Sequence, residues 1–169
     1  MRGLAVVMAL CVPVLYGEVV DKSAAGFLVR TTVTVAPKPA AVYAALIEPS
    51  KWWQSAHTWS GEAKNLSINA RAGGCFCERL PSGGEVQHMT VIYADPGKVL
   101  RMSGALGPMQ EAGVVGTLTF ELKPAGEGTQ IILSYSAGGY FQGGLQALAT
   151  PVDQMLGAQL EGLAKLLAK

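Results

Sequence analysis

The chain has 169 residues, of which 50% are hydrophobic and only 15% are charged, and its formal net charge is +1. This length suits one domain with a substantial core. A nearly neutral chain with no basic stripe interleaved with aromatic residues does not indicate a nucleic-acid partner. Its 21 glycines and 9 prolines are spread along the chain, which is not the composition of a low-complexity linker.

The first residues predict a secretory signal. Met1 and Arg2 precede an apolar run, LAVVMALCVPVLY, over residues 4–16. A short positive start followed by about 7–15 apolar residues is typical of a signal peptide, and the run is too short to span a bilayer as a mature helix. We therefore expect removal of residues 1–17 and a periplasmic or secreted protein without a stable membrane anchor. The alternative is that the run forms a buried strand or helix of the mature chain.

The next elements alternate between strand and helix patterns. Alternating β-branched residues predict a strand over 26–35, and 37–47 changes to helical spacing. Pro49 ends that helix, and residues 50–55 predict one further helical turn. Further strands are expected over 57–68, 75–80, 85–94, 98–106, 114–123 and 129–137. Short turns such as PSGG at 81–84 join consecutive strands, which is typical of an antiparallel sheet.

The C-terminus predicts one long amphipathic helix. Its apolar residues recur every three or four positions, at Leu148, Val152, Leu156, Leu160, Leu163 and Leu167. A helix of this kind must bury its apolar stripe, and the sheet is the only large partner available. The predicted fold class is therefore α+β, with a curved antiparallel sheet wrapped around a long C-terminal helix and two short helices after the first strand.

This order of elements resembles the START-like (SRPBCC) superfamily, whose architecture is the helix-grip fold. The nearest branch is similar to the polyketide-cyclase-like and Hsp-ATPase-activator-like single-domain proteins. The resemblance rests on VAPKPAAVYAALIEPSKWW, AGGCFCERLPSGGEVQHMTVIYADPGKVLRMSG, GTLTFELKPAGEGTQIILSY and the terminal helix. It predicts a single domain over residues 26–169 and implies a hydrophobic cavity between sheet and helix. A fold shared so widely does not define the chemistry.

Cys75 and Cys77 lie one residue apart in a predicted strand, and their state is open. Cα atoms at positions i and i+2 of a strand are about 6.6 Å apart, so a disulfide requires a bulge. If Leu80 faces Glu85 in the hairpin, Cys77 faces His88, and two thiols beside an imidazole are zinc ligands by type. The one-residue spacing and the lack of a fourth ligand argue against a metal site. The pattern therefore favours two small, partly buried thiols.

His88 is a candidate acid–base residue, and Glu78 is a candidate partner if it is buried. A straight strand pairing places the two on opposite faces of the sheet, which argues against the pair. A shift of the register by one residue would turn inward Phe76, Glu78, Gln87 and Met89 instead. The residues expected to contact a ligand are Trp53, His57, Phe76, Cys77, His88, Met89, Met109, Tyr135 and Tyr140. The glycine-rich segments 104–113 and 138–144 are candidates for a gate, although each also fits an ordinary turn.

Three functions fit these observations. The first is an exported protein without cofactors that binds a small hydrophobic or aromatic molecule between sheet and helix, which requires only apolar volume. The second is a cofactor-free cyclase or dehydratase that uses His88 or a nearby acid, which requires polar groups converging in the same cavity. The third is chaperone regulation, against which the predicted export argues. The sequence indicates no metal and leaves the oligomeric state and the ligand open.

Overall fold

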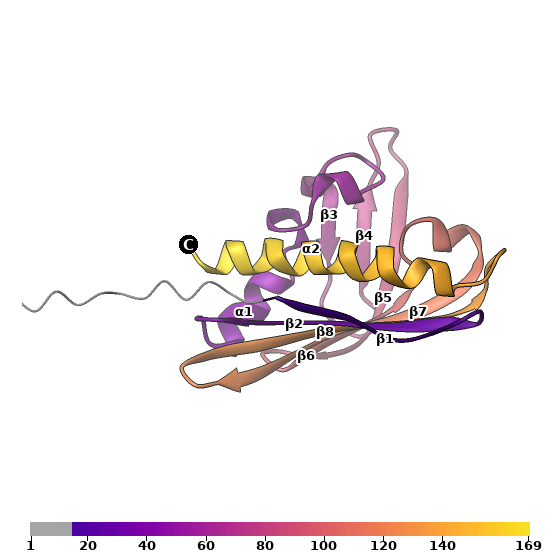
Figure 1. Cartoon of the computed structure of the whole chain (residues 1–169). Helices are drawn as coiled ribbons and strands as arrows, with labels where there is room; N and C mark the ends of the chain where they lie inside the picture. The colour runs from indigo at the N-terminus through magenta and orange to yellow at the C-terminus, as the bar shows by residue number, and fades with distance from the viewer. Residues whose placement is uncertain (1–14) are drawn as a thin grey trace, which may run out of the picture.

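Eight antiparallel strands form one open, curved sheet in the computed structural model, which describes residues 15–169. The strand order is β1-β2-β8-β7-β6-β5-β4-β3. The strands are β1 Tyr16–Ser23, β2 Gly26–Val35, β3 Leu66–Ile68, β4 Cys75–Arg79, β5 Glu85–Asp95, β6 Val99–Gly104, β7 Gly113–Ala125 and β8 Gly128–Tyr140. Figure 1 shows β3, β4 and β5 rising beside the C-terminal helix, while β1, β2 and β8 lie beneath it. Most of the predicted signal, residues 1–14, lies outside the described residues.

Two α-helices and five short 3₁₀ turns complete the described part of the fold. The helices are α1 Pro39–Leu46 and α2 Ala149–Leu167. The turns are η1 Pro49–Lys51, η2 Ser55–His57, η3 Ala63–Asn65, η4 Gly107–Glu111 and η5 Gln146–Leu148. Within residues 15–169, no helix is both long and apolar enough to cross a membrane.

Helix α2 buries its predicted stripe against the concave face of the sheet. Leu156, Leu160 and Leu163 are fully buried there. The backbone of α2 also closely approaches the segment before η2, because a Cβ atom on Gly162 would lie only 2.3 Å from the carbonyl oxygen of Trp52. The sheet therefore grips the helix, and the predicted helix-grip fold is confirmed.

Two segments differ from the expected elements. Strand β1, which the sequence pattern does not predict, pairs with β2 from Tyr16 opposite Thr32 to Ser23 opposite Gly26, so a cut after Gly17 would fall inside it. The strand expected over 57–68 is wrong except at β3. Residues 55–65 form the turns η2 and η3 instead, and backbone N–H groups of this segment bond to a side chain of β4 rather than to a neighbouring strand.

From Cys77 to Arg79, the hairpin of β4 and β5 has a register one residue away from the expected one. Cys77 lies opposite Gln87 and not His88. The physical reason is the length of the loop, since the Leu80 N–H donates to the Gly84 carbonyl at 2.8 Å and three residues remain between them. Gly83 supplies the positive φ of +88° that this three-residue loop requires.

Candidate functional site

A β-bulge at His88 brings the two candidate acid–base residues to the same face of the sheet. Phe76 pairs with Met89 and Cys77 pairs with Gln87, so His88 is the extra residue on β5. His88 and Met89 are consequently both buried, although they are consecutive in a strand. The expectation that His88 and Glu78 face opposite sides was wrong, because it assumed a straight pairing without this extra residue.

Glu78 lies on β4 with its side chain fully buried. Its Oε2 accepts the backbone N–H of Trp59 at 3.1 Å, and its Oε1 accepts the backbone N–H of Ser60. Its Oε2 also lies 2.9 Å from Nε2 of His88. Burial raises the pKa of Glu78, but the hydrogen bonds from Ser60, Trp59 and His88 outweigh burial and hold the pKa below its ordinary value. Glu78 is therefore a buried carboxylate whose negative charge is fully hydrogen-bonded.

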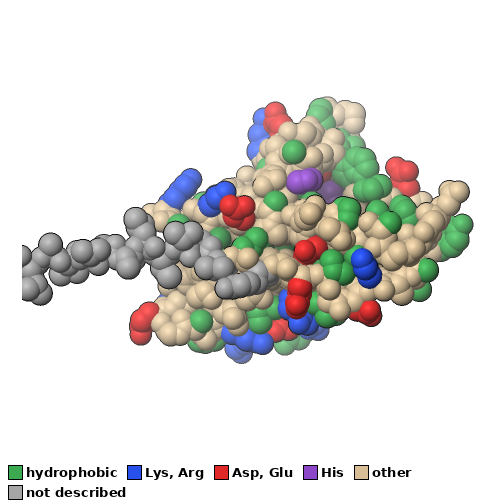
Figure 2. Space-filling view, in the orientation of Figure 1, with side chains coloured by type: hydrophobic (Ala, Val, Ile, Leu, Met, Phe, Trp, Pro, Cys, Tyr) green, Lys and Arg blue, Asp and Glu red, His purple; other side chains and the backbone are tan. Residues whose placement is uncertain are grey.

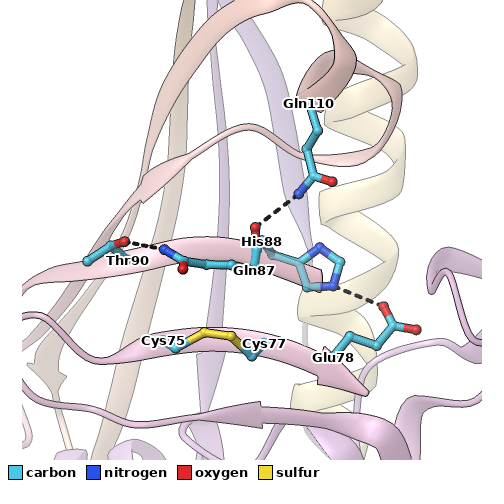
Figure 3. Close-up of a disulfide and its surroundings, with 7 residues drawn as sticks. All are labelled: Cys75, Cys77, Glu78, Gln87, His88, Thr90 and Gln110. Atoms are coloured by element: carbon cyan, nitrogen blue, oxygen red, sulfur yellow. Dashed lines mark hydrogen bonds and ion pairs between the residues drawn. A yellow bond between two sulfur atoms is a disulfide. The ribbon is translucent and has the colours of Figure 1, made fainter. Parts of the chain in front are cut away.

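The imidazole of His88 is held by Glu78 on one side only. Only 7% of the residue is exposed. Burial lowers the pKa of His88, and the opposing effect of Glu78 does not restore it. The neutral ring donates through Nε2 to Glu78, while Nδ1 makes no hydrogen bond to residues 15–169. Figure 3 shows one ring nitrogen directed to Glu78 and the other directed away from it. The arrangement leaves an acceptor nitrogen on a nearly buried ring.

A cavity of about 330 Å³ lies beside His88, between the sheet and α2. It is lined by Trp53, Ala56, His57, Thr58, Trp59, Leu66, Phe76, His88, Leu106, Gly107, Pro108, Met109, Leu148, Pro151, Val152 and Met155. Lysine, arginine, aspartate and glutamate are all missing from these described lining residues. Figure 2 shows hydrophobic side chains beside histidine at the surface between α2 and the raised part of the sheet. The cavity is thus an apolar space with two imidazole rings, those of His57 and His88, in its lining.

The second histidine is held by helix α2. His57 lies on η2, and its Nδ1 is 2.9 Å from Nε2 of Gln159. Gln159 is fully buried on α2, and its Oε1 accepts the backbone N–H of Gln54 at 2.7 Å. The indole of Trp53 donates to the His57 carbonyl oxygen at 3.0 Å and packs edge-on against Phe76 with ring centroids 5.4 Å apart. Helix and sheet therefore each place one histidine at the cavity.

The predicted ligand-contact residues fall into two groups. Those that line the cavity are Trp53, His57, Phe76, His88 and Met109. Those that do not are Cys77, Met89, Tyr135 and Tyr140.

The four that do not line the cavity have other environments. Met89 is core, and Tyr140 is 75% exposed at the end of β8. Tyr135 is fully buried, its hydroxyl donates to the Gly104 carbonyl oxygen at 3.4 Å, and burial raises its pKa to about 12. Of the two segments considered as gates, 104–113 supplies a cavity wall through η4, whereas 138–144 supplies none.

Cys75 and Cys77 form a disulfide on the face of β4 that points away from the cavity. Their Cα atoms are 5.4 Å apart, closer than in a regular strand, and the register of β4 and β5 shifts between Phe76 and Cys77. The preference for two free thiols was therefore wrong. The expected cluster of these cysteines with His88 is also wrong, since Cys77 pairs with Gln87 and His88 lines the cavity. Within residues 15–169, no group of three or more His, Cys, Asp and Glu side chains is arranged to hold a metal ion.

Gln159 is the site residue that the sequence interpretation missed. Its only signal in the sequence is that a polar residue directly precedes the stripe residue Leu160. A glutamine at such a position of an amphipathic helix can be buried or exposed, and the pattern does not distinguish the two. Val152 and Met155 were assigned no contact, although both line the cavity from α2.

Known proteins share the architecture of this chain. The family model described as polyketide cyclase / dehydrase and lipid transport matches residues 27–168. Protein MLL2253 from Mesorhizobium loti is 19% identical, with a TM-score of 0.62 over 83% of this chain and 96% of that one. CalU16 from Micromonospora echinospora is 14% identical, with a TM-score of 0.59 over 91% and 81%. The Aha1 dimer from Colwellia psychrerythraea is 19% identical, with a TM-score of 0.60 over 83% and 95%.

At such identities these structures share the fold alone with this chain, whereas the family match covers most of its length. A search of curated proteins found no match. The resemblance to the START-like (SRPBCC) superfamily is confirmed.

Proposed function

Since the chain belongs to the polyketide cyclase / dehydrase and lipid transport family, we propose that it binds one small, uncharged, largely apolar molecule between the sheet and α2. The observation that supports this is the cavity itself. Its volume of about 330 Å³ is near the lower end of the range of about 300–1,000 Å³ for ligand pockets. Such a volume suits a small ring system better than a long acyl chain.

The chemistry of the walls supports an uncharged ligand. Burying an unpaired charge is costly, and the described lining contains no side chain of opposite formal charge to compensate for one. Trp53 and Phe76 present aromatic surfaces against which a flat ring can pack.

Calorimetric titration with naphthalene tests the proposal. Val152→Phe places a ring in the cavity from α2, and Gln154→Phe adds the same ring at an exposed position of the same helix. We expect the wild-type protein and Gln154→Phe to bind naphthalene and Val152→Phe to bind at least tenfold more weakly. Equal binding by all three would place the ligand elsewhere, and no binding by the wild type would contradict the proposal.

The pairing of Glu78 with His88 favours a second candidate, an enzyme of the cyclase or dehydratase type. A neutral imidazole with a free Nδ1, held by a buried carboxylate, has the form of a general base. In this hypothesis Nδ1 removes a proton from the carbon next to a carbonyl group. The C–H electron pair then forms the C=C bond of an enolate, and the carbonyl π electrons move to oxygen. The imidazolium that forms is stabilised by Glu78.

Exchange of the α-protons of 2-tetralone in D₂O separates the enzyme from the binding protein. An enzyme accelerates the exchange above the rate in buffer, and His88→Phe removes the acceleration by at least about 100-fold, as general-base catalysis contributes. Binding of 2-tetralone without accelerated exchange would leave the binding function alone.

We also propose that the protein works outside the reducing cytoplasm. The N-terminal sequence predicts a signal, and the Cys75–Cys77 disulfide suits an oxidising compartment. Intact mass of protein from the exported fraction tests this proposal. We expect a shortened N-terminus and a mass two hydrogens below that of the reduced chain. Full-length, reduced protein recovered from the cytoplasm would contradict it.

A further inference from the structure

The hydrogen-bonding network determines which nitrogen of His57 carries the proton. A backbone N–H can only donate, so the atom of Gln159 that faces the Gln54 N–H must be the amide oxygen. The other end of Gln159 is therefore the NH₂ group. It contacts Nδ1 of His57 at 2.9 Å and the Met155 carbonyl oxygen at 3.3 Å. Because NH₂ can only donate, Nδ1 of His57 accepts, and the neutral ring carries its proton on Nε2.

The same argument shows that the free ring nitrogen of His88 is Nδ1, whereas that of His57 is Nε2. Glu78 accepts two backbone N–H groups, from Trp59 and Ser60, and its Oε2 also lies 2.9 Å from Nε2 of His88. A carboxylate can only accept, so Nε2 of His88 carries the proton and Nδ1 has a lone pair. Both rings are thus the Nε2–H tautomer, but they are held by opposite nitrogens. His57 leaves an N–H donor at the cavity mouth, and His88 leaves an acceptor on a side chain more than nine-tenths buried.

We propose that His57 and His88 act as a donor–acceptor pair that selects ligands with a hydroxyl group on an sp² carbon, a phenol or an enol. Both histidines line the same cavity. In this proposal one hydroxyl donates to Nδ1 of His88 and accepts from Nε2–H of His57, while its ring packs among the apolar walls. A carboxylate is rejected, because its oxygens would face the lone pair of His88 within apolar walls. This inference rests on the proposed ligand site and specifies the chemistry of the ligand's polar end.

Gln159 has the role of a positioning residue in this pair. It does not line the cavity, but it decides which edge of His57 is the donor. Gln159→Glu keeps an oxygen for the Gln54 N–H and replaces the NH₂ by a second acceptor. In that variant Nδ1 of His57 must carry a proton.

Long-range ¹H–¹⁵N NMR spectra of the histidine rings, recorded at pH 8.5, test the assignment without any ligand. We expect both rings of the wild type to be Nε2–H tautomers, and Nδ1 of His57 to become protonated in Gln159→Glu. A wild-type His57 protonated on Nδ1, or a His88 protonated on Nδ1, would overturn the inference. If Gln159→Glu does not fold, the wild-type spectrum still decides.

Four ligands of similar ring size test the selectivity by calorimetry. We expect 2-naphthol to bind about tenfold or more tightly than naphthalene, as one or two net hydrogen bonds give. We expect 2-methoxynaphthalene, which cannot donate, to lose most of this gain, and 2-naphthoate to bind more weakly than naphthalene. His57→Phe should reduce the ratio of 2-naphthol affinity to naphthalene affinity to less than about threefold, whatever its effect on naphthalene binding itself.

The outcomes separate this inference from the proposed function. If naphthalene binds and Val152→Phe weakens it, but 2-naphthol binds no better, the cavity is the ligand site and the donor–acceptor pair is refuted. Tighter binding of 2-naphthoate than of naphthalene would refute the pair in the same way. If none of the four ligands binds, the proposed function fails and the inference fails with it.

Discussion

Replacing Glu78 with alanine removes the acceptor of three hydrogen bonds at once. The backbone N–H groups of Trp59 and Ser60 and the Nε2–H of His88 all lose their partner. A buried donor without a partner costs about 1–3 kcal/mol, and here three donors lose their partner. Because Trp59 and Ser60 lie in a surface segment that water can reach, we expect a total loss of about 3–5 kcal/mol in the free energy of unfolding. Such a loss is a large part of the roughly 5–15 kcal/mol typical of a domain.

The measurement is urea unfolding followed by tryptophan fluorescence. Glu78→Gln is expected to cost less, about 1–3 kcal/mol, because its oxygen still accepts while its NH₂ faces a donor. Glu85→Ala, at an exposed glutamate of the same hairpin, is the control and is expected to change stability by no more than about 0.5 kcal/mol. The reasoning is refuted if Glu78→Ala loses no more stability than Glu85→Ala does.

Three further predictions concern the hairpin and helix α2. Gly162→Ala is expected to lower the free energy of unfolding by about 1–3 kcal/mol, because its Cβ would meet the Trp52 backbone at 2.3 Å. Gly157→Ala on the same helix would make only an ordinary van der Waals contact, with the Leu15 side chain at 3.6 Å, and should raise the free energy of unfolding by about 0.5–1 kcal/mol in the same urea titration. The double variant Cys75→Ser/Cys77→Ser should lose only about 1–2 kcal/mol in that assay, since the disulfide closes a very short loop; a loss above about 4 kcal/mol would contradict this reasoning. The pKa of His88 is depressed from 6.5, so the unfolded chain takes up a proton that the folded chain does not, and stability should fall as pH drops below about 6.5. Urea midpoints between pH 8 and pH 5 check this fall, and His88→Phe should make it shallower.

The sequence predicted the layers of this fold better than the register of its strands. The stripe from Leu148 to Leu167 and the alternation in 26–35 are periodic signals, and both elements lie where the pattern places them. The strand expected over 57–68 was largely wrong because the Trp59 and Ser60 N–H groups of this irregular segment bond to Glu78, a partner distant in sequence, and local alternation does not show such a partner. The expected pairing across the loop after Leu80 was wrong because this loop has one residue more than expected, and one added residue exchanges the two faces of a strand.

At the candidate site, too, residue types were easier to predict than strand pairing. His57, His88 and Glu78 were all recognised by residue type, but the pairing of His88 with Glu78 was rejected on a sound rule about straight strands. The bulge at His88 is what makes the pairing possible, and no signal in the residues of β5 marks it. A disulfide between Cys75 and Cys77 was expected to require a bulge, and the extra residue lies on the neighbouring strand β5. Chemistry could therefore be predicted from residue types, whereas its geometry depended on one inserted residue.

The two histidines also depend on different parts of the fold. His88 is held by the sheet, through the bulge in β5 and the carboxylate of Glu78 on β4. His57 is held by α2, through Gln159. A hydroxyl group that contacts both rings therefore joins helix to sheet through hydrogen bonds. The apolar walls provide no such directional bond. Ligand binding of this kind stabilises the folded protein by about 2.7 kcal/mol at a ligand concentration 100 times Kd. A purely apolar ligand of equal affinity gives the same stabilisation but leaves Nε2 of His57 and Nδ1 of His88 without a partner. Only the hydroxyl ligand therefore changes the ring ¹⁵N signals of both histidines together.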